Sequence, residues 1–257
     1  MVDAVIFDWA GTTVDYGCFA PVEAFMATFR NAGVEPTVDE TRKPMGMLKI
    51  DHIRTMLHMD RIASEWERVH GAAPTEDDVH ALYVPYEEML LSILHNFATP
   101  KPYVLDAVAA LREAGVLIGS TTGYNEKMMQ IVVPAAAQQG YVPDFTITPD
   151  DTDGMGRPYP YMVFRNMEAL GVSDVRRVAK VGDTVADIEE GVNAGVISIG
   201  VVEGSSVMAL SEKEYEALSE DDRKAACART EKVFRDAGAD AVIRNMSELP
   251  TLLAQLV

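Results

Sequence analysis

A short apolar run near the start of the chain ends abruptly in a carboxylate. Residues Ala4 to Phe7 are all apolar, Asp8 follows them, and small or turn-forming residues continue from Gly11 to Val14. A run of this length and composition indicates a strand buried on both faces, as in parallel sheets. Asp8 is then expected at the carboxyl end of the strand, where open α/β sheets bind their ligands. Taken alone, Asp8 could equally cap the next loop or helix.

Two later apolar runs end in a similar way. The run 117–123 finishes in hydroxyls and a glycine, and the run 178–187 finishes in two acids, Asp183 and Asp187. Between these runs Arg157 places a cation in a glycine- and proline-containing loop. Because the carboxyl ends of neighbouring parallel strands lie at one edge of a sheet, these side chains are expected to converge on the first carboxylate.

Strands and helices are expected to alternate over the second half of the chain. This alternation predicts an α/β fold with a doubly wound parallel sheet. The expected strands after the first are 117–121, 145–148, 178–181, 196–202 and 241–243.

The stretch between the first two strands has a different pattern. Apolar residues recur at helical spacing over 22–29, and Pro44 is expected to open a second helix that runs to about residue 58. No convincing strand interrupts this stretch. We therefore expect an α/β catalytic core made of residues 1–18 and 99–257, with an inserted all-helical cap domain at 19–98.

Charge and composition exclude some classes of protein. The chain has 257 residues, of which 48% are hydrophobic, and a formal net charge of −18. So acidic a chain is not expected to bind nucleic acid, which requires clustered cations. No apolar run long enough to span a membrane and no basic leader is evident, and the two cysteines, Cys18 and Cys227, suit a reducing compartment. The expectation is a cytoplasmic protein without a membrane partner.

The converging acids predict a metal site. Asp8 and Asp183 repel each other if they meet, unless a cation lies between them. Carboxylate oxygens next to a phosphate-type group favour Mg²⁺. Asp187, one helical turn after Asp183, is placed to orient a ligand or a metal-bound water from the second layer. The competing interpretation is that Asp183 and Asp187 only cap a helix.

A phosphorus centre beside such a metal needs its negative oxygens held. Thr122 and the backbone N–H groups of Gly123 and Tyr124 form a candidate cradle. Arg157 would supply a cation with several donors, unless it is an ordinary solvated loop residue.

The ordered set of an aspartate, a hydroxyl, a cation and an acid pair resembles the four motifs of the haloacid dehalogenase superfamily. The resemblance implies that Asp8 is a nucleophile that forms an aspartyl-phosphate, and that the backbone carbonyl of Ala10 is a metal ligand. The sequence departs from the superfamily at two positions. Arg157 stands where lysine is usual, and Ala10 stands where phosphatases carry a second aspartate that protonates the leaving-group oxygen.

The missing acid changes the expected leaving group. Ala10 cannot donate a proton, so either the enzyme is poor or the group that leaves is not an alkoxide. If the broken bond is P–C, the departing carbanion needs an electron sink, which a lysine Schiff base with a neighbouring aldehyde provides. Lys49 is the candidate: on a helix it would share a face with Met45 and Ile53, whose apolar surroundings lower its pKa. His52 is a possible proton shuttle, and an exposed surface lysine is the competing interpretation.

Longer runs sharpen the resemblance to one family. The segments 5–17, 42–46, 49–52 and 119–124 are similar to the phosphonatase, or phosphonoacetaldehyde hydrolase, family. The similarity continues through 149–151, 156–160 and 181–184 and weakens after about Ser206. It implies hydrolysis of phosphonoacetaldehyde to acetaldehyde and phosphate during 2-aminoethylphosphonate degradation, with Mg²⁺, by a homodimer.

Three alternatives stay open at the level of sequence. A phosphate-monoester phosphatase of the same fold would keep its activity after Lys49→Arg. A haloacid dehalogenase would also use Asp8 but would not depend on Mg²⁺. A non-catalytic binding module would be unaffected by loss of Asp8.

Overall fold

The computed structural model describes residues 2–256, and its centre is a six-stranded parallel sheet. The strands lie in the order β3-β2-β1-β4-β5-β6, so the direction of winding reverses between β1 and β4. The strands are β1 (Ala4–Phe7), β2 (Leu117–Ser120), β3 (Phe145–Thr146), β4 (Val178–Gly182), β5 (Ile197–Val201) and β6 (Ala241–Ile243). The doubly wound parallel sheet predicted from the sequence is confirmed. The strand expected at 145–148 is shorter than predicted, since β3 has two residues.

The register explains why the site forms where it does. Phe7, the last residue of β1, is paired with Ser120 of β2 on one side and with Val181 of β4 on the other. All four residues of β1 are buried, which is why the strand reads as a continuous apolar run. The residues that follow these three strands therefore emerge side by side, at the point where the winding reverses.

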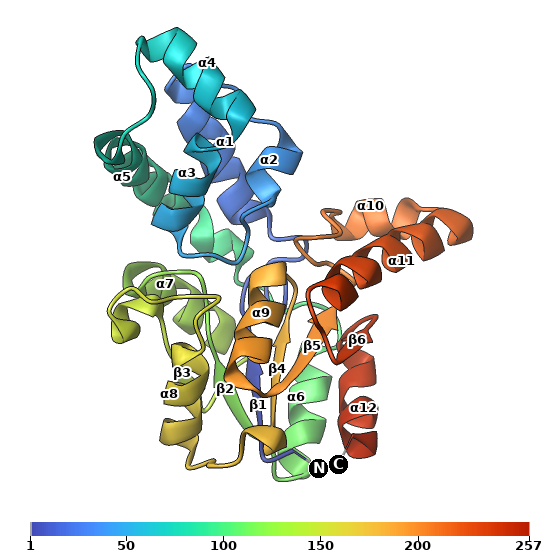
Figure 1. Ribbon diagram of the computed structural model, residues 1–257. Helices are drawn as coiled ribbons and strands as arrows, with labels where there is room; N and C mark the ends of the chain where they lie inside the picture. The colour runs from blue at the N-terminus through green and yellow to red at the C-terminus, as the bar shows by residue number, and fades with distance from the viewer. Residues whose placement is uncertain (1, 257) are drawn as a thin grey trace.

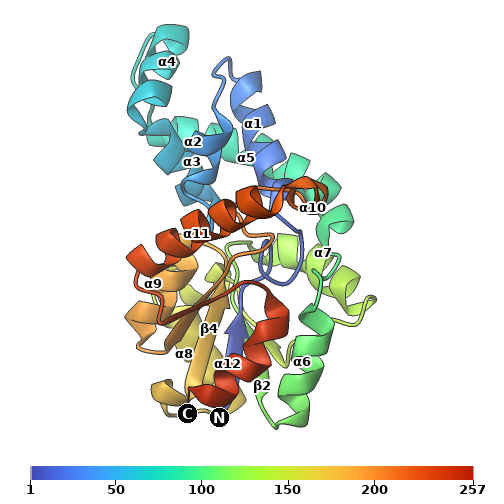
Figure 2. The ribbon, with the colours of Figure 1, turned by 90° about the vertical axis from the view of Figure 1, so that its right-hand side faces the viewer.

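Helices cover both faces of the sheet. Figure 2 shows the sheet between two helical layers, with α8 and α9 on one side and α6 and α12 on the other. The bounds of these helices, with α7, are α6 Val104–Glu113, α7 Glu126–Ala137, α8 Tyr161–Leu170, α9 Val185–Ala194 and α12 Leu249–Gln255.

Five further helices gather beyond the carboxyl ends of the strands, at the top of Figure 1. They are α1 (Phe19–Asn31), α2 (Val38–Arg42), α3 (Lys49–Leu57), α4 (Asp60–His70) and α5 (Glu76–Ile93), followed by the 3₁₀ turn η1 (Leu94–Phe97). We call this group the cap helices and the remainder the core. The chain passes between the two groups at 15–18 and again at 98–103, which we call the two crossing segments. The exact domain boundaries stay a prediction.

Cap helices and core pack together without a break. One continuous apolar cluster includes Phe7 and Trp9 of the core as well as Phe25 and Ile53 of the cap helices. The structure thus shows the cap helices in contact with the strand ends.

The helix predicted from Pro44 is wrong. Residues 43–46 form a turn, and α3 begins only at Lys49. Gly46 has φ +88, a left-handed conformation that does not continue a right-handed helix. Lys49 therefore does not share a helical face with Met45, although both side chains are buried. The sequence interpretation also missed α2, which Thr37 begins with a capping box to Glu40.

An acidic pair of helices lies between β5 and β6. α10 spans Glu212–Ala217 and α11 spans Glu220–Asp236, and Ser219 caps α11. Both helices lie beside the carboxyl edge of the sheet (Figure 1). Within residues 2–256, no helix combines the length and the apolar character needed to cross a membrane.

Candidate active site

Asp8 stands at the end of β1, and its surroundings fix its position. Its backbone N–H continues the ladder to β4 by donating to the carbonyl of Val181 at 2.9 Å. Its own carbonyl accepts a hydrogen bond from the Thr13 hydroxyl at 3.0 Å, within the turn that reverses the chain. Only 4% of Asp8 is exposed, so its carboxylate points into the protein and not into bulk water.

Three buried aspartates meet at this strand end. Ligand oxygens of Asp8, Asp183 and Asp187 all lie within 4.8 Å of one another. Asp183 directly follows β4, and Asp187 lies in the first turn of α9, where Thr184 and Asp187 form a capping box. The sequence therefore placed these acids together correctly, and Asp187 also caps its helix. Its role in orienting a ligand or a metal-bound water stays a prediction.

The three carboxylates differ in how many of their oxygens already have a hydrogen-bond or ion-pair partner in the protein. Asp187 Oδ1 is paired with Lys180 at 2.6 Å and with Arg157 at 2.9 Å, and its Oδ2 accepts from the Thr184 hydroxyl at 2.6 Å. Both oxygens of Asp187 are therefore occupied, which suits a supporting residue better than a direct metal ligand.

Asp183 carries a charge that the protein does not balance directly. Its oxygens accept from the Thr12 hydroxyl at 3.0 Å and from the Ser206 N–H at 2.6 Å, but it has no ion-pair partner among residues 2–256. Burial, followed by the negative charge of Asp8, raises the pKa of Asp183 to about 7. Burial would also raise the pKa of Asp187, but Arg157 and Lys180 bring it below its ordinary value. The charged form of Asp183 thus needs a cation.

A hard divalent cation fits this site. The donors available between Asp8 and Asp183 are carboxylate oxygens, which Mg²⁺ prefers. Ala10 lines the same pocket as Asp8. A divalent metal ion suits a fully buried carboxylate that has hydrogen bonds but no direct ion pair, and whose charge is offset only in part by the nearby Lys101.

Each nitrogen of the Arg157 guanidinium forms an ion pair with a different acidic residue. Nε lies 3.1 Å from Glu190, Nη1 lies 2.9 Å from Asp187, and Nη2 lies 2.6 Å from Asp8. Nη2 also donates to the Thr121 hydroxyl at 3.0 Å. A lysine has one nitrogen and could not connect these positions in a planar fork. The arginine at this position is therefore matched to its neighbours.

Sequence reasoning missed the buried partners of this arginine. Glu190 lies one helical turn after Asp187 on α9, and its Oε2 also accepts from the Thr121 hydroxyl at 3.0 Å. Lys180 is fully buried within β4 and lies 3.5 Å from Glu190. Two signals were available in the sequence. Lys180 lies inside an apolar strand run, and Glu190 follows Asp187 by three residues.

The three residues of the predicted oxygen cradle lie together after β2, and their role in binding phosphoryl oxygens stays a prediction. Thr122, Gly123 and Tyr124 all line the pocket. The Tyr124 N–H donates to the Thr122 hydroxyl at 3.0 Å, so it is already used within the loop. A Cβ on Gly123 would lie 2.7 Å from the carbonyl oxygen of Met47, which shows how closely the loop before α3 approaches this residue.

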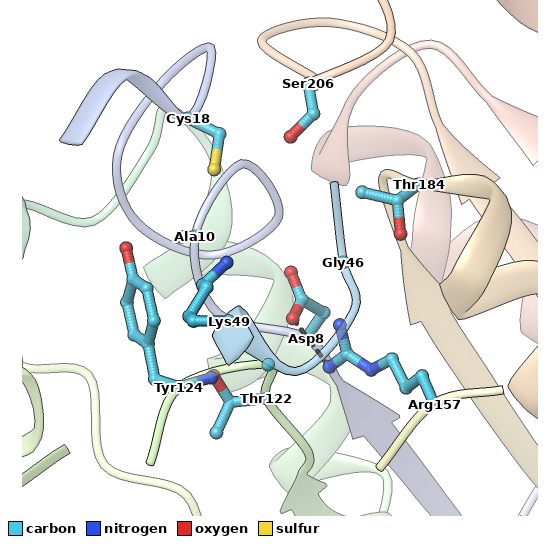
Figure 3. Close-up of a pocket in the computed structure, with 11 residues that line it drawn as sticks. Asp8, Ala10, Cys18, Gly46, Lys49, Thr122, Tyr124, Arg157, Thr184 and Ser206 are labelled. Carbon is cyan, nitrogen blue, oxygen red and sulfur yellow. Dashed lines mark hydrogen bonds and ion pairs between the residues drawn. The ribbon is translucent and has the colours of Figure 1, made fainter. Parts of the chain in front are cut away.

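Lys49 reaches the pocket from the cap helices. Figure 3 shows its amine and the carboxylate of Asp8 both pointing into the space between cap and core. The side chain is 4% exposed, and its Nζ lies 5.0 Å from the centre of the Tyr124 ring. Burial lowers the pKa of Lys49 below the ordinary lysine value. The competing picture of an exposed surface lysine does not describe this residue.

His52 is not among the residues that line the pocket. It is fully buried, its ring is stacked on Phe25 at 3.8 Å, and its Nε2 is 2.8 Å from the carbonyl of Thr41. Burial, followed by the charge of Lys49, holds the pKa of His52 well below its usual range. A role for His52 as a proton shuttle stays a prediction.

The pocket is nearly closed. The free space enclosed by Asp8, Lys49, Thr122, Arg157 and their neighbours is about 20 Å³, roughly room for one water molecule. A substrate of several heavy atoms needs more room than the pocket offers in this arrangement of the cap helices and the core.

The parallel sheet and the three buried aspartates at its carboxyl edge are features of one class of hydrolase. A family model described as a haloacid dehalogenase-like hydrolase matches residues 2–195, and the chain is a hydrolase of that superfamily. A phosphonoacetaldehyde hydrolase of Lysinibacillus sphaericus is 52% identical over 252 residues, which cover 98% of this chain and 94% of that protein. A phosphonoacetaldehyde hydrolase of Bacillus cereus is 50% identical over 255 residues, covering 99% of this chain and 96% of the relative.

Two other similar proteins are a longer bifunctional enzyme and a protein whose crystal structure is known. A bifunctional phosphonoacetaldehyde hydrolase/aminoethylphosphonate transaminase of Clostridioides difficile is 50% identical over 99% of this chain, which spans 40% of that longer protein. The crystal structure of a phosphonoacetaldehyde hydrolase-like protein from Oleispira antarctica superposes with a TM-score of 0.95 at 37% identity, covering 99% of this chain and 92% of that chain. The chain belongs to the phosphonoacetaldehyde hydrolase family, as the sequence resemblance predicted.

Proposed function

We propose that this protein hydrolyses the P–C bond of phosphonoacetaldehyde to give acetaldehyde and phosphate. The observation that carries the proposal is the buried amine of Lys49, which lines one pocket with the Asp8 carboxylate where Ala10 replaces an acid. The names of the relatives that cover nearly the whole chain support the same substrate.

The first step uses the amine of Lys49. Its neutral nitrogen adds to the aldehyde carbon, and loss of water leaves a protonated imine. The imine withdraws electrons from the adjacent carbon, which is the carbon bound to phosphorus. The lowered pKa of Lys49 increases the fraction of neutral amine that can begin this step.

The second step uses the carboxylate of Asp8. Its oxygen attacks phosphorus while the P–C bond breaks, and the bonding pair moves into the imine to give an enamine. Thr122 and Arg157 hold the negative oxygens of the phosphoryl group. Water then hydrolyses the aspartyl-phosphate, and the enamine takes up a proton at carbon before hydrolysis of the imine releases acetaldehyde.

Mg²⁺ is the metal that we assign to the site. Asp8, Asp183 and the carbonyl of Ala10 would hold it, and Asp187 would support it by fixing Arg157 and Lys180. When bound, the metal would offset the negative charge of the phosphoryl oxygens.

Borohydride trapping tests the proposal directly. The protein is treated with phosphonoacetaldehyde and borohydride, and the modified peptide is mapped by mass spectrometry. We expect the label on Lys49. Lys49→Arg should remove both the label and the turnover of phosphonoacetaldehyde, whereas Lys43→Arg, at an exposed lysine six residues earlier, should change neither.

Other outcomes point to the alternatives. Hydrolysis of common phosphate monoesters that survives Lys49→Arg would indicate a phosphatase, and activity without Mg²⁺ would indicate a dehalogenase. If Asp8→Asn changes no measurable activity, the protein is a binding module.

Three further properties belong to the same proposal. The bifunctional relative couples its hydrolase to an aminoethylphosphonate transaminase, and we infer a place for this protein in 2-aminoethylphosphonate degradation. Its two free cysteines suit the cytoplasm. We also infer a homodimer, which light scattering on the purified protein would test.

A further inference from the structure

The loop after β5, residues 203–206, receives hydrogen bonds from both crossing segments. The N–H of Gly17, in the first segment, donates to the carbonyl of Gly204 at 2.8 Å. Lys101, in the second segment, is buried, and its ammonium donates to the carbonyls of Glu203 at 2.8 Å and Gly204 at 3.0 Å. Each route by which the chain passes between core and cap is thus attached to this one loop.

The same loop holds a carboxylate of the metal site. The N–H of Ser206 donates to Asp183 Oδ2 at 2.6 Å. The carbonyl of Ser206 faces the cap helices, because it accepts a hydrogen bond from Arg42 Nη1 at 3.2 Å. A continuous path of hydrogen bonds therefore runs from Arg42 through the backbone of Ser206 to Asp183.

Arg42 differs from the other donors in where it comes from. It is the last residue of α2, which belongs to the cap helices, whereas Gly17 and Lys101 belong to the crossing segments. Its Nη1 also donates to the carbonyl of Gly17 at 2.8 Å, and its guanidinium lies 4.8 Å from the centre of the Phe19 ring. When the cap helices move away from the core, the contact with Ser206 must lengthen, while the attachments of the crossing segments can persist.

We propose that Arg42 is a positioning residue that couples closure of the cap helices to the orientation of Asp183. It acts through the backbone of Ser206, whose carbonyl accepts from Arg42 and whose N–H donates to the carboxylate of Asp183. Coupling of this kind is reciprocal. Closure favours metal binding at Asp183, and bound metal favours closure by the same factor. The inference rests on the proposed function in so far as Asp183 is taken as a metal ligand.

The test compares two arginine variants in the cap helices. Arg42→Gln removes the charged donor at Ser206. Arg30→Gln makes the same chemical change at an exposed arginine that pairs with Glu35 at 2.7 Å. Mg²⁺ binding to the whole protein is measured by calorimetry, and amide hydrogen exchange over residues 42–49 is measured with and without Mg²⁺.

We expect Arg42→Gln to raise the Mg²⁺ dissociation constant about tenfold, since a hydrogen bond from a charged donor is lost. Mg²⁺ should slow exchange over residues 42–49 in the unaltered protein and in Arg30→Gln, but not in Arg42→Gln. Arg42→Lys keeps the charge and should restore part of both effects. If Arg42→Gln does not fold, the lysine variant is compared with Arg30→Lys in its place.

Equal Mg²⁺ affinity and equal Mg²⁺-dependent protection in Arg42→Gln and the unaltered protein would overturn the coupling. Failure of the unaltered protein to bind Mg²⁺ would overturn it as well. Neither measurement uses a phosphonate, so a protein that does not hydrolyse phosphonoacetaldehyde could still show the coupling. The two proposals can therefore fail separately.

Discussion

Lys49 is useful as a nucleophile only when its amine is neutral. An ordinary lysine has a pKa of 10.5 and is almost wholly protonated near neutral pH, but burial lowers the pKa of Lys49. The reactive form appears above the pKa, so a lower pKa moves the rising limb of imine formation to lower pH. We expect the borohydride-trapped fraction of Lys49 to rise with a midpoint below 10.5.

The exposed Lys43 provides the comparison within the same molecule. Its peptide is mapped in the same digest, after trapping at a series of pH values with a simple aldehyde in excess. If the labelling of Lys49 and of Lys43 rises over the same pH range, burial does not activate Lys49 and the first step of the mechanism loses its support.

Glu190 matters because it binds Nε of Arg157, while Nη2 of the same guanidinium pairs with Asp8. It is fully buried, and its Oε2 lies 3.1 Å from Arg157 Nε. Glu190→Gln removes the charge that holds the guanidinium plane, so that Nη2 is no longer directed at Asp8. We expect kcat for phosphonoacetaldehyde to fall about tenfold or more, in line with the loss of a charged hydrogen bond, while Mg²⁺ affinity stays close to that of the unaltered protein.

The adjacent residue on α9 gives a matched control. Glu189→Gln makes the same change at an exposed position, and kcat should stay within about twofold, as for most surface substitutions. Equal kcat values for the two variants would remove the positioning role. A double change with Arg157→Lys should cost less than the sum of the single changes, because both act on one interaction.

The element that closes the site is the loop between α2 and α3. A Cβ on Gly123 would lie 2.7 Å from the Met47 carbonyl oxygen and 3.0 Å from the Gly46 carbonyl oxygen. Gly123 itself is not in the left-handed region, so an alanine there is opposed only by this loop. We expect Gly123→Ala to hold the cap helices away from the core and to raise KM for phosphonoacetaldehyde.

Thermal unfolding separates this effect from general damage. The clash exists only while the loop is packed against the core, so the melting temperature should change little. A large drop in melting temperature with an unchanged KM would show that the substitution disturbs the strand end and not closure.

The same loop shows what the sequence could and could not predict. The strand ends and the acids of the site were evident, because apolar runs that stop at Asp8 and Asp183 can be read locally. The start of α3 was not, because helical periodicity continued through Gly46, whose backbone is left-handed and packs so closely on Thr184 that an added Cβ would clash with it. Arg42 and Ser206 were missed for a related reason: they act through backbone carbonyls and N–H groups, which leave no signature in side-chain type.

At the scale of the whole molecule, cap and core share one apolar cluster and close over a space of about 20 Å³. Substrate entry must therefore break contacts that stabilise the fold. The hydrogen bonds at the crossing segments remain available to limit the movement, which is consistent with a hinge at these two places.

The stability of the whole molecule should depend on pH through Asp183. Its pKa is raised to about 7 in the folded protein, from an ordinary value of 3.8. Between these values the folded state holds a proton that the unfolded state has lost, so the free energy of unfolding falls as pH rises through this window and levels off above it. Mg²⁺ binds the ionised carboxylate and should counteract the loss.

We therefore expect Mg²⁺ to raise the melting temperature more at about pH 8 than at about pH 5, because proton and metal compete for the same carboxylate. Asp183→Asn should flatten this part of the pH dependence and remove the Mg²⁺ effect. Burial also raises the pKa of Asp15 to about 7, so this acid adds a slope of the same sign in both proteins, and the difference between them isolates Asp183. An Asp183→Asn protein that keeps the full pH slope and the full Mg²⁺ shift would mean that the buried charge is balanced elsewhere and that the metal binds at another place.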